Sequence, residues 1–287
     1  MTVRTILVPV RGDGKGETVL DHALSLARRY AAHLDVIHCR PRPEDLLPFG
    51  VSVPAMLKKD ILASAGTLAD EEERKLKDLF EDYCARHKLT VIDAPPWPKD
   101  RVSVSWRERT GKQAAIVGLY GRLADLTVVA QPDSQRNLGL NTLEAALLET
   151  GRPVLMCPAK AAGDIGAHIA LAWNGSSEIS RAITAAMPML ESADTVTLLS
   201  VSEGPAGPLG PEDGQAYLAS HGIACGVRAI TARATGTGQA LLGGAKDAGA
   251  DVLLMGAYGQ SRRRELVLGG VTQHIIDRAD LPVLLMH

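Results

Sequence analysis

Hydrophobic residues in this chain gather in short, almost unbroken runs that do not alternate with polar residues. The clearest runs are Ile6–Val10, Leu126–Ala130, Val154–Met156, Ile169–Trp173, Val252–Met255 and Val283–Met286. A strand without alternation is buried on both faces, which is typical of parallel strands covered by helices. Amphipathic helical patterns separate these runs, so the sequence predicts an α/β fold.

The same order of elements occurs twice along the chain. The first half opens with "TILVPVRGDGKGETVLDHALSLARRYAAHLDVIHC" and the second with "HIALAWNGSSEISRAITAAMPMLESADTVTLLSV". Each copy has a strand, a glycine turn, an amphipathic helix and another strand. We therefore expect two copies of a doubly wound, mostly parallel five-stranded sheet flanked by helices, a Rossmann-like α/β fold. The Ala- and Gly-rich linker Pro158–Ala167 places the boundary near residue 161, giving domains 1–160 and 161–287.

Two further features affect the expected architecture. The first half has a proline-rich segment, Arg40–Met56, which we expect to be a long loop, and then a charged amphipathic helix from about Lys58 to His87 that packs on the core. The runs at 154–156 and 283–286 end their halves and should be sheet edges. Exposed edges favour pairing.

Composition and charge exclude several function classes. The formal net charge is −2, from 31 basic and 33 acidic residues, so no overall positive field favours nucleic acid. No apolar run approaches the roughly 18 residues that span a membrane, and the N-terminus does not have the pattern of a signal peptide. The four cysteines are scattered without a CxxC pair, as expected of free thiols in a reducing compartment. We expect a cytoplasmic protein.

Glycines and arginines cluster near the C-terminus, in "GAYGQSRRRELVLGGVT". Gly256 and Gly259 close a predicted strand, and Gly269 and Gly270 precede a helix. Glycines let the backbone approach a ligand closely, and the N-terminus of a helix favours an anion. The arginines at 262–264 could add positive charge. Two interpretations stand on this evidence alone, a phosphate-binding loop or an ordinary βα loop with a solvated basic face.

The spacing Gly, two residues, Gly, nine residues, Gly at positions 256, 259 and 269 resembles the nucleotide motif of the universal stress protein family. The opening Asn174-Gly175-Ser176 resembles that family's strand–"DGS"–helix start. Together with the duplication, these motifs make the chain similar to tandem members of the family. The resemblance is clear over residues 167–287 and weaker over the first half.

The resemblance implies an ATP- or ADP-binding second domain, with or without Mg²⁺, and a regulatory role in the stress response. The site residues that it implies, together with those suggested by the local pattern, are Trp173, Asn174, Gly256, Gly259, Arg262, Gly269, Gly270, Val271 and Thr272. Asn174 takes the position of the family's aspartate, and Gly270 stands where the family has Ser or Thr. Trp173 is expected either to stack on a base or to fill space by packing.

The first half lacks these residues. Aligned on the strand at 126–130, Ala130 and Asp133 stand at the first two glycine positions, and Arg11 stands where Asn174 is found in the second half. We therefore expect no nucleotide there. The segment "GDGKGET" (Gly12–Thr18) does not have the spacing of a P-loop.

No sequence pattern indicates catalysis or a metal centre. The eight histidines form neither HxH nor HExxH, and no serine lies in a Gly-x-Ser-x-Gly elbow. We expect a protein that is not an enzyme, although weak nucleotide hydrolysis needs no dedicated residues. Two alternatives remain, a nucleotide-free scaffold or regulatory protein of the same fold and an adenine-nucleotide-dependent enzyme.

The expected partners follow from these features. They are an adenine nucleotide, no nucleic acid and no membrane. In the family the last strands of two domains pair, which implies that the two halves of this chain form an internal pseudo-dimer; a homodimer of whole chains is a further option.

Overall fold

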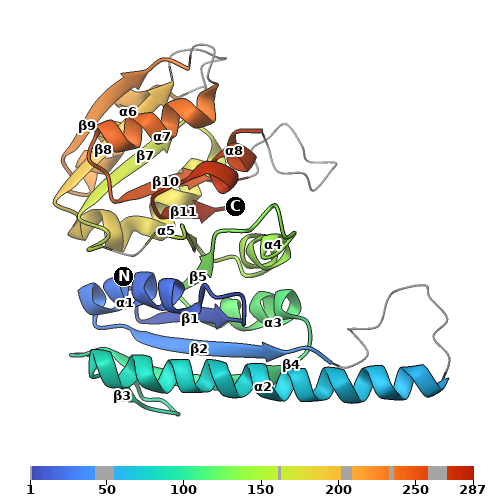
Figure 1. Cartoon of the computed structure of the whole chain (residues 1–287). Helices are drawn as coiled ribbons and strands as arrows, with labels where there is room; N and C mark the ends of the chain where they lie inside the picture. The colour runs from blue at the N-terminus through green and yellow to red at the C-terminus, as the bar shows by residue number, and fades with distance from the viewer. Residues whose placement is uncertain (1, 43–54, 161–162, 202–208, 233–235, 258–269) are drawn as a thin grey trace.

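The computed structural model describes residues 2–42, 55–160, 163–201, 209–232, 236–257 and 270–287. The first half follows the predicted alternation of strands and helices (Figure 1). Its elements are β1 (Thr5–Val10), α1 (Gly16–Tyr30), β2 (His33–Arg40), α2 (Ala55–His87), β3 (Thr90–Val91), β4 (Ser103–Thr110), α3 (Gln113–Tyr120), the 3₁₀ turn η2 (Gly121–Leu123), β5 (Leu126–Ala130), α4 (Leu140–Glu149) and β6 (Val154–Cys157).

The second half repeats this order with fewer additions. Its elements are β7 (His168–Trp173), α5 (Ser177–Ser192), β8 (Thr195–Val201), α6 (Pro211–Ser220), β9 (Cys225–Ile230), α7 (Thr237–Asp247), β10 (Val252–Gly256), α8 (Gly270–Arg278) and β11 (Val283–Met286). All six hydrophobic runs found in the sequence lie in strands. The domain boundary predicted near residue 161 falls on residues outside the described ranges and stays a prediction.

The eleven strands of the described residues form one sheet, in the order β3-β4-β2-β1-β5-β6-β11-β10-β7-β8-β9. Every neighbouring pair is parallel except β6 and β11, which are antiparallel with Leu155 opposite Leu284. The predicted fold class is confirmed, with one difference in strand number. The first half contributes six strands instead of five, because the two-residue β3 extends its edge.

Helices cover both faces of the sheet, and each face has one continuous core. Buried side chains from α1, α2, α5 and α6 pack on one face, and those from α3, α4, α7 and α8 pack on the other. Both cores contain residues from the two halves, so the sheet and its helical layers pass through the middle of the chain without a break.

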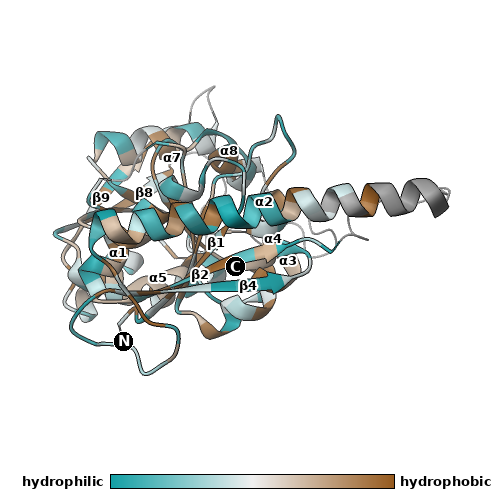
Figure 2. Cartoon of the chain, turned by 60° about the horizontal axis from the view of Figure 1, so that its bottom comes forward, coloured by the Kyte–Doolittle hydropathy of each residue, from teal (hydrophilic) through white to brown (hydrophobic). Residues whose placement is uncertain are grey.

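The long helix α2 lies along the outer edge of the first half and extends past the rest of the molecule (Figure 2). It starts at Ala55, three residues before the predicted start. Leu76, Phe80 and Tyr83 are buried, which confirms the predicted packing face over this part of the helix. Most of the expected loop between β2 and α2, residues 43–54, lies outside the described residues.

The topology defines where a ligand would bind in each half. In each copy the strand order reverses beside the first strand, between β1 and β5 in the first half and between β7 and β10 in the second. In open α/β sheets, ligands bind at the carboxyl ends of the strands at such a reversal. The two candidate positions are therefore the loops that follow β1 and β5 and those that follow β7 and β10.

Candidate functional site

The second-half position lies where β7 and β10 end. Leu254 in β10 pairs with Leu171 in β7, so the two strands run side by side towards their carboxyl ends. The loop after β7 leads into α5, and the segment after β10 leads into α8. Both helices begin at the carboxyl ends of the strands, as expected for parallel βα units.

The loop after β7 is a tight turn held by its own polar groups. Asn174 is exposed, and its Oδ1 accepts a hydrogen bond of 3.1 Å from the backbone N–H of Ser176. Gly175 has a φ of 66°, and an added Cβ would lie 2.6 Å from the Leu209 carbonyl oxygen, so only glycine fits there. Ser176 caps α5 by accepting from Ile179 N–H at 3.4 Å.

Trp173 is a packing residue in this structure. Its side chain is buried, and its indole N–H donates to the Leu209 carbonyl at 3.2 Å. A Cβ added to Gly214 of α6 would lie 2.9 Å from the indole ring. The ring is therefore held against α6, which agrees with the packing alternative raised by the sequence.

Gly256 ends β10 directly against the first turn of α5. An added Cβ would lie 2.7 Å from the Cβ of Glu178 and 2.9 Å from the backbone nitrogen of Ile179. A side chain at position 256 would therefore push α5 away from the sheet. This close approach is a reason for glycine that is independent of any ligand.

The N-terminus of α8 presents a different environment. Gly270 is exposed, and an added Cβ there would meet no described atom within 4 Å. Val271 is also exposed, whereas Thr272 is buried at 6% exposure. The first turn of α8 contains no acidic residue, so no internal carboxylate neutralises the positive end of the helix dipole. This end of α8 is suited to receive an anion.

The structure brings together only part of the predicted site. Asn174, Gly256, Gly270, Val271 and Thr272 lie on the loops and helix starts at this edge of the sheet. The remaining predicted residues, Gly259, Arg262 and Gly269, lie outside the described residues, as do the arginines at 263 and 264.

No sequence pattern singles out Glu178, yet it has an unusual position beside Gly256. It is 8% exposed, and its Oε2 has no hydrogen-bond partner among the described residues, whereas Oε1 accepts from the Ser177 hydroxyl at 3.1 Å. Burial alone would raise the pKa of Glu178, but hydrogen bonds from its own backbone N–H and from Ser176 and Ser177 hold the pKa below its ordinary value. A charged oxygen is therefore kept at the edge of the candidate site.

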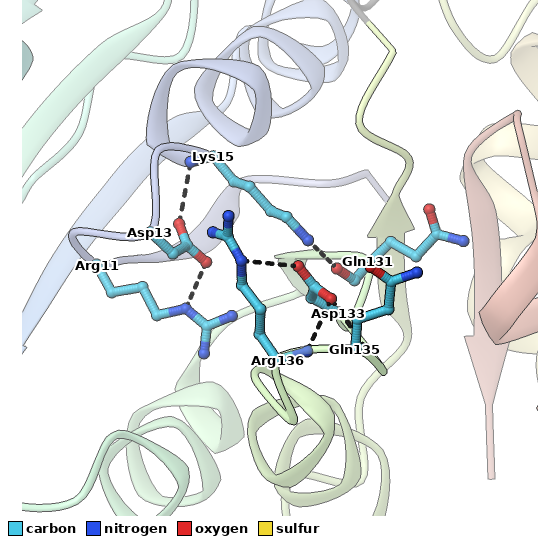
Figure 3. A network of polar contacts seen from close by, with 7 residues as sticks. All are labelled: Arg11, Asp13, Lys15, Gln131, Asp133, Gln135 and Arg136. Atoms are coloured by element: carbon cyan, nitrogen blue, oxygen red, sulfur yellow. Dashed lines mark hydrogen bonds and ion pairs between the residues drawn. The ribbon is translucent and has the colours of Figure 1, made fainter.

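The corresponding first-half position holds a network of charged side chains (Figure 3). Arg11 Nε lies 2.6 Å from Asp13 Oδ2, and Asp13 Oδ1 accepts from the backbone N–H of Lys15 at 3.0 Å. Lys15 Nζ donates to the carbonyl of Gln131 at 2.8 Å, which joins the loop after β1 to the loop after β5.

The loop after β5 is short and closed on itself. Asp133 and Leu138 exchange two backbone hydrogen bonds of 2.8 and 3.0 Å, and Asp133 Oδ1 accepts from the N–H groups of Gln135 and Arg136 at 3.1 Å. Asp133, which aligns with the second motif glycine, therefore serves to shape this loop. The prediction that no nucleotide binds here is not tested by these contacts.

Within the described part of the chain, no helix is long and apolar enough to cross a lipid bilayer. No group of three or more His, Cys, Asp or Glu side chains within the same part is arranged to hold a metal ion. All four cysteines are free thiols, with Cys39, Cys84 and Cys157 buried and Cys225 partly exposed.

Comparison with known proteins gives the clearest family match for the second half. The model of the universal stress protein family matches residues 167–287. A universal stress protein of Methanocaldococcus jannaschii is 38% identical over 42 residues, an alignment that covers 15% of this chain and 26% of that relative.

Solved structures match the chain over its whole length. A universal stress protein from Archaeoglobus fulgidus DSM 4304 superposes with a TM-score of 0.68 at 14% identity, covering 100% of this chain and 99% of that chain. A protein from Pseudomonas aeruginosa UCBPP-PA14, provisionally described as a universal stress protein, gives a TM-score of 0.60 at 17% identity, covering 99% and 93%. At this identity the likeness shows a shared fold for both halves.

Proposed function

We propose that the second half of this chain, whose residues 167–287 match the model of the universal stress protein family, binds ATP or ADP where β7 and β10 end. The observation that supports the proposal best is the first turn of α8. No described atom lies within 4 Å of a Cβ added to Gly270, and the first helical turn contains no acidic residue. Together with the glycine spacing in the sequence, this gives a polyphosphate both room and a favourable dipole.

Different residues would contact the adenosine and the phosphates of such a ligand. Asn174 in the loop after β7 would contact the ribose or the base, and the backbone amides at the start of α8 would hold the phosphates. Arg262, with Gly259 and Gly269, would complete the phosphate site from the segment between β10 and α8. Thr272 is the least exposed of the three residues at the helix start, so backbone groups would provide most of the cradle.

We propose a regulatory role and no dedicated catalysis. Burial raises the pKa of Cys39 to about 12 and that of Cys84 to about 11, so neither thiol supplies a nucleophilic thiolate at neutral pH. The exposed polar residues at the start of α5 have the hydrogen-bonding roles of a turn and a cap. Slow hydrolysis of bound nucleotide needs no further machinery. Mg²⁺, if present, would accompany the phosphates.

One observation favours a second candidate, a nucleotide-free scaffold of the same fold. Asn174 Oδ1 is already bonded to Ser176 N–H, and Trp173 is packed against α6. Two groups that could recognise an adenosine are thus engaged with protein. The two candidates make opposite predictions for the purified protein.

A nucleotide-release measurement separates these candidates. We expect the supernatant of the heated, purified chain to contain ATP or ADP by mass spectrometry, and added ATP to raise the melting temperature of the nucleotide-free chain by mass action. Bovine serum albumin taken through the same steps controls for carry-over. Absence of nucleotide together with an unchanged melting temperature would leave the scaffold. Turnover of ATP at about 1 per second or faster would instead indicate an enzyme.

A further inference from the structure

A small, partly open hollow lies in the first half between the loops that follow β1 and β5. It occupies the strand-reversal position of this half, at the carboxyl ends of the strands. Its polar lining comes from Arg11, Asp13, Lys15, Gln113 and Thr142, and Gly16 and Gly139 leave backbone exposed to it. None of these residues belongs to the nucleotide motif of the second half.

The basic side chains that line this hollow outnumber the acidic ones. Arg11 uses only its Nε, on Asp13, and neither of its terminal guanidinium nitrogens has a hydrogen-bond partner among the described residues. Lys15 Nζ bonds a backbone carbonyl, that of Gln131, and no carboxylate. Asp13 is 9% exposed in its side chain, and both its oxygens already accept hydrogen bonds. Two cations therefore face one acid whose oxygens are engaged.

Three helices begin at the hollow, which adds to the excess of positive charge. Gly16 and Gln113 are the first residues of α1 and α3, and Gly139 is the N-cap of α4. None of the three helices has a side-chain cap at its N-terminus. The acid in the first turn of α1, Glu17, is paired with Arg86 of α2 at 2.7 Å. Asp13 accepts from the backbone N–H of Lys15 at the start of α1, whereas the first turns of α3 and α4 contain no acidic residue, so the partial positive charge of those two helix starts is unopposed there.

The position of Arg11 is unfavourable without a ligand. One of its terminal nitrogens lies 2.8 Å from where a Cβ on Gly139 would be, at the start of α4. Lys15 is likewise the N-cap residue of α1. Cations at helix N-termini are destabilising, because the dipole there favours negative charge. An anion placed between the side chains and the helix starts would turn this repulsion into attraction on both sides.

We propose that this hollow binds a small, doubly charged oxyanion of the inorganic phosphate class. The guanidinium of Arg11 and the ammonium of Lys15 bind its oxygens, together with backbone amides at the start of α1 and α4. Arg11 covers Gly139, and the loop from Asp133 to Leu138 is closed by its own hydrogen bonds, so the site admits a compact anion and excludes a nucleotide. This second site is independent of ATP binding in the other half.

Titration of the whole chain with inorganic phosphate tests this proposal. In amide-resolved nuclear magnetic resonance spectra, we expect the signals of Gly16 and Gly139 to shift together and to saturate. Arg11→Gln should weaken phosphate binding at these signals by roughly 10- to 100-fold, the range expected for a lost charge-assisted hydrogen bond. Lys15→Gln is the second variant. The matched control is Arg122→Gln, because Arg122 is exposed at the opposite edge of the sheet and bonds the Glu149 carbonyl.

Each outcome decides the proposal. Shifts at Gly16 and Gly139 that need at least about tenfold more phosphate in Arg11→Gln, and no more in Arg122→Gln, would support it. Signals at these glycines that do not respond to phosphate would overturn it, even if the signal of Gly270 in α8 does respond. Equal weakening by Arg11→Gln and Arg122→Gln would also overturn it, because that result would indicate a diffuse field and no site. ATP added in place of phosphate should leave Gly16 and Gly139 unmoved.

Discussion

At the scale of single residues, Gly256 and Gly270 belong to the same stretch of sequence but have different physical reasons to be glycine. Gly256 lies against the backbone of α5, where a side chain has no room. At Gly270, the first residue of α8, an added Cβ would meet no described atom within 4 Å. The sequence pattern treats them alike, because spacing alone does not reveal what each backbone position touches.

Alanine substitutions should separate the two roles. Gly256→Ala should lower the free energy of unfolding by about 1–3 kcal/mol, because the added Cβ forces α5 away from β10. Gly270→Ala should leave it unchanged or raise it by up to about 1 kcal/mol, since alanine restricts the unfolded chain and fits the helix. Urea unfolding measures both values. A larger loss for Gly270→Ala than for Gly256→Ala would contradict this assignment of roles.

His33 is a second residue whose environment could not be read from sequence. Its two ring nitrogens lie 2.8 Å from Ser103 Oγ and 3.0 Å from Ser105 Oγ, and Trp97 stacks on the ring. Burial, with a contribution from the positive charge of Arg107, lowers the pKa of His33 to about 4. The histidines are scattered along the chain, and their spacing does not indicate that this one is held neutral in the core.

The lowered pKa of His33 predicts a pH-dependent stability. Above pH 6.5 both folded and unfolded chains carry the neutral ring, so its contribution is fully present. As pH falls from 6.5 towards 4, only the unfolded chain takes up the proton, and stability falls by up to about 3 kcal/mol. His33→Gln should show a smaller loss over this interval in urea unfolding, with the exposed His221→Gln as control. Equal losses in both variants would refute the assignment.

At the scale of elements, hydrophobic runs predicted the central strands well and the outer strands poorly. The run Ile6–Val10 became β1 with one residue added, and Leu126–Ala130 became β5 without change. The edge strands β9 and β3 were not predicted, because their residues are mostly exposed and have no apolar run. Sequence patterns report burial, so strands at a sheet edge leave a weaker signal.

The candidate site shows the same limit. The helix start at Gly270 and the turn at Asn174 were predicted from glycine and polar positions, and both lie at the expected edge of the sheet. The packing of Trp173 on α6 and the partnerless oxygen of Glu178 depend on contacts between elements far apart in sequence. The charged hollow of the first half was missed for the same reason. Lys15 was considered only as part of a P-loop, whose spacing it does not fit.

At the scale of the whole molecule, the half-sheets of the two halves are joined by the antiparallel pair of β6 and β11, which we call the seam. The apolar runs at the end of each half had suggested this pairing. Gln131 adds to this junction by donating from its side chain to the carbonyl of Ile276 in α8 at 2.7 Å and to that of Ala279, directly after α8, at 3.2 Å. Tyr30 reaches Ser192 of α5 at 2.8 Å. The halves should therefore unfold together.

A cavity at the seam tests this cooperativity. Leu155 is fully buried in β6 opposite Leu284, and Leu155→Ala should lower the free energy of unfolding by about 2–5 kcal/mol. Hydrogen exchange should speed up in β1 and in β7 alike, since both strands belong to one cooperative sheet. Leu34→Ala, a buried change in β2, which β1 and β5 separate from β6, serves as a comparison of equal size. Faster exchange confined to the first half would show that the halves unfold separately.

The central claim is that the second half holds an adenine nucleotide against the N-terminus of α8, and calorimetric titration with ATP tests it most directly. We expect one ATP per nucleotide-free chain. Gly270→Asp should weaken binding tenfold or more, because its carboxylate takes the position of the phosphates, while it stabilises the helix through the dipole. Arg11→Gln in the first half should leave ATP affinity unchanged. Absence of binding heat in the parent chain, or an affinity that Gly270→Asp does not alter, would contradict the claim.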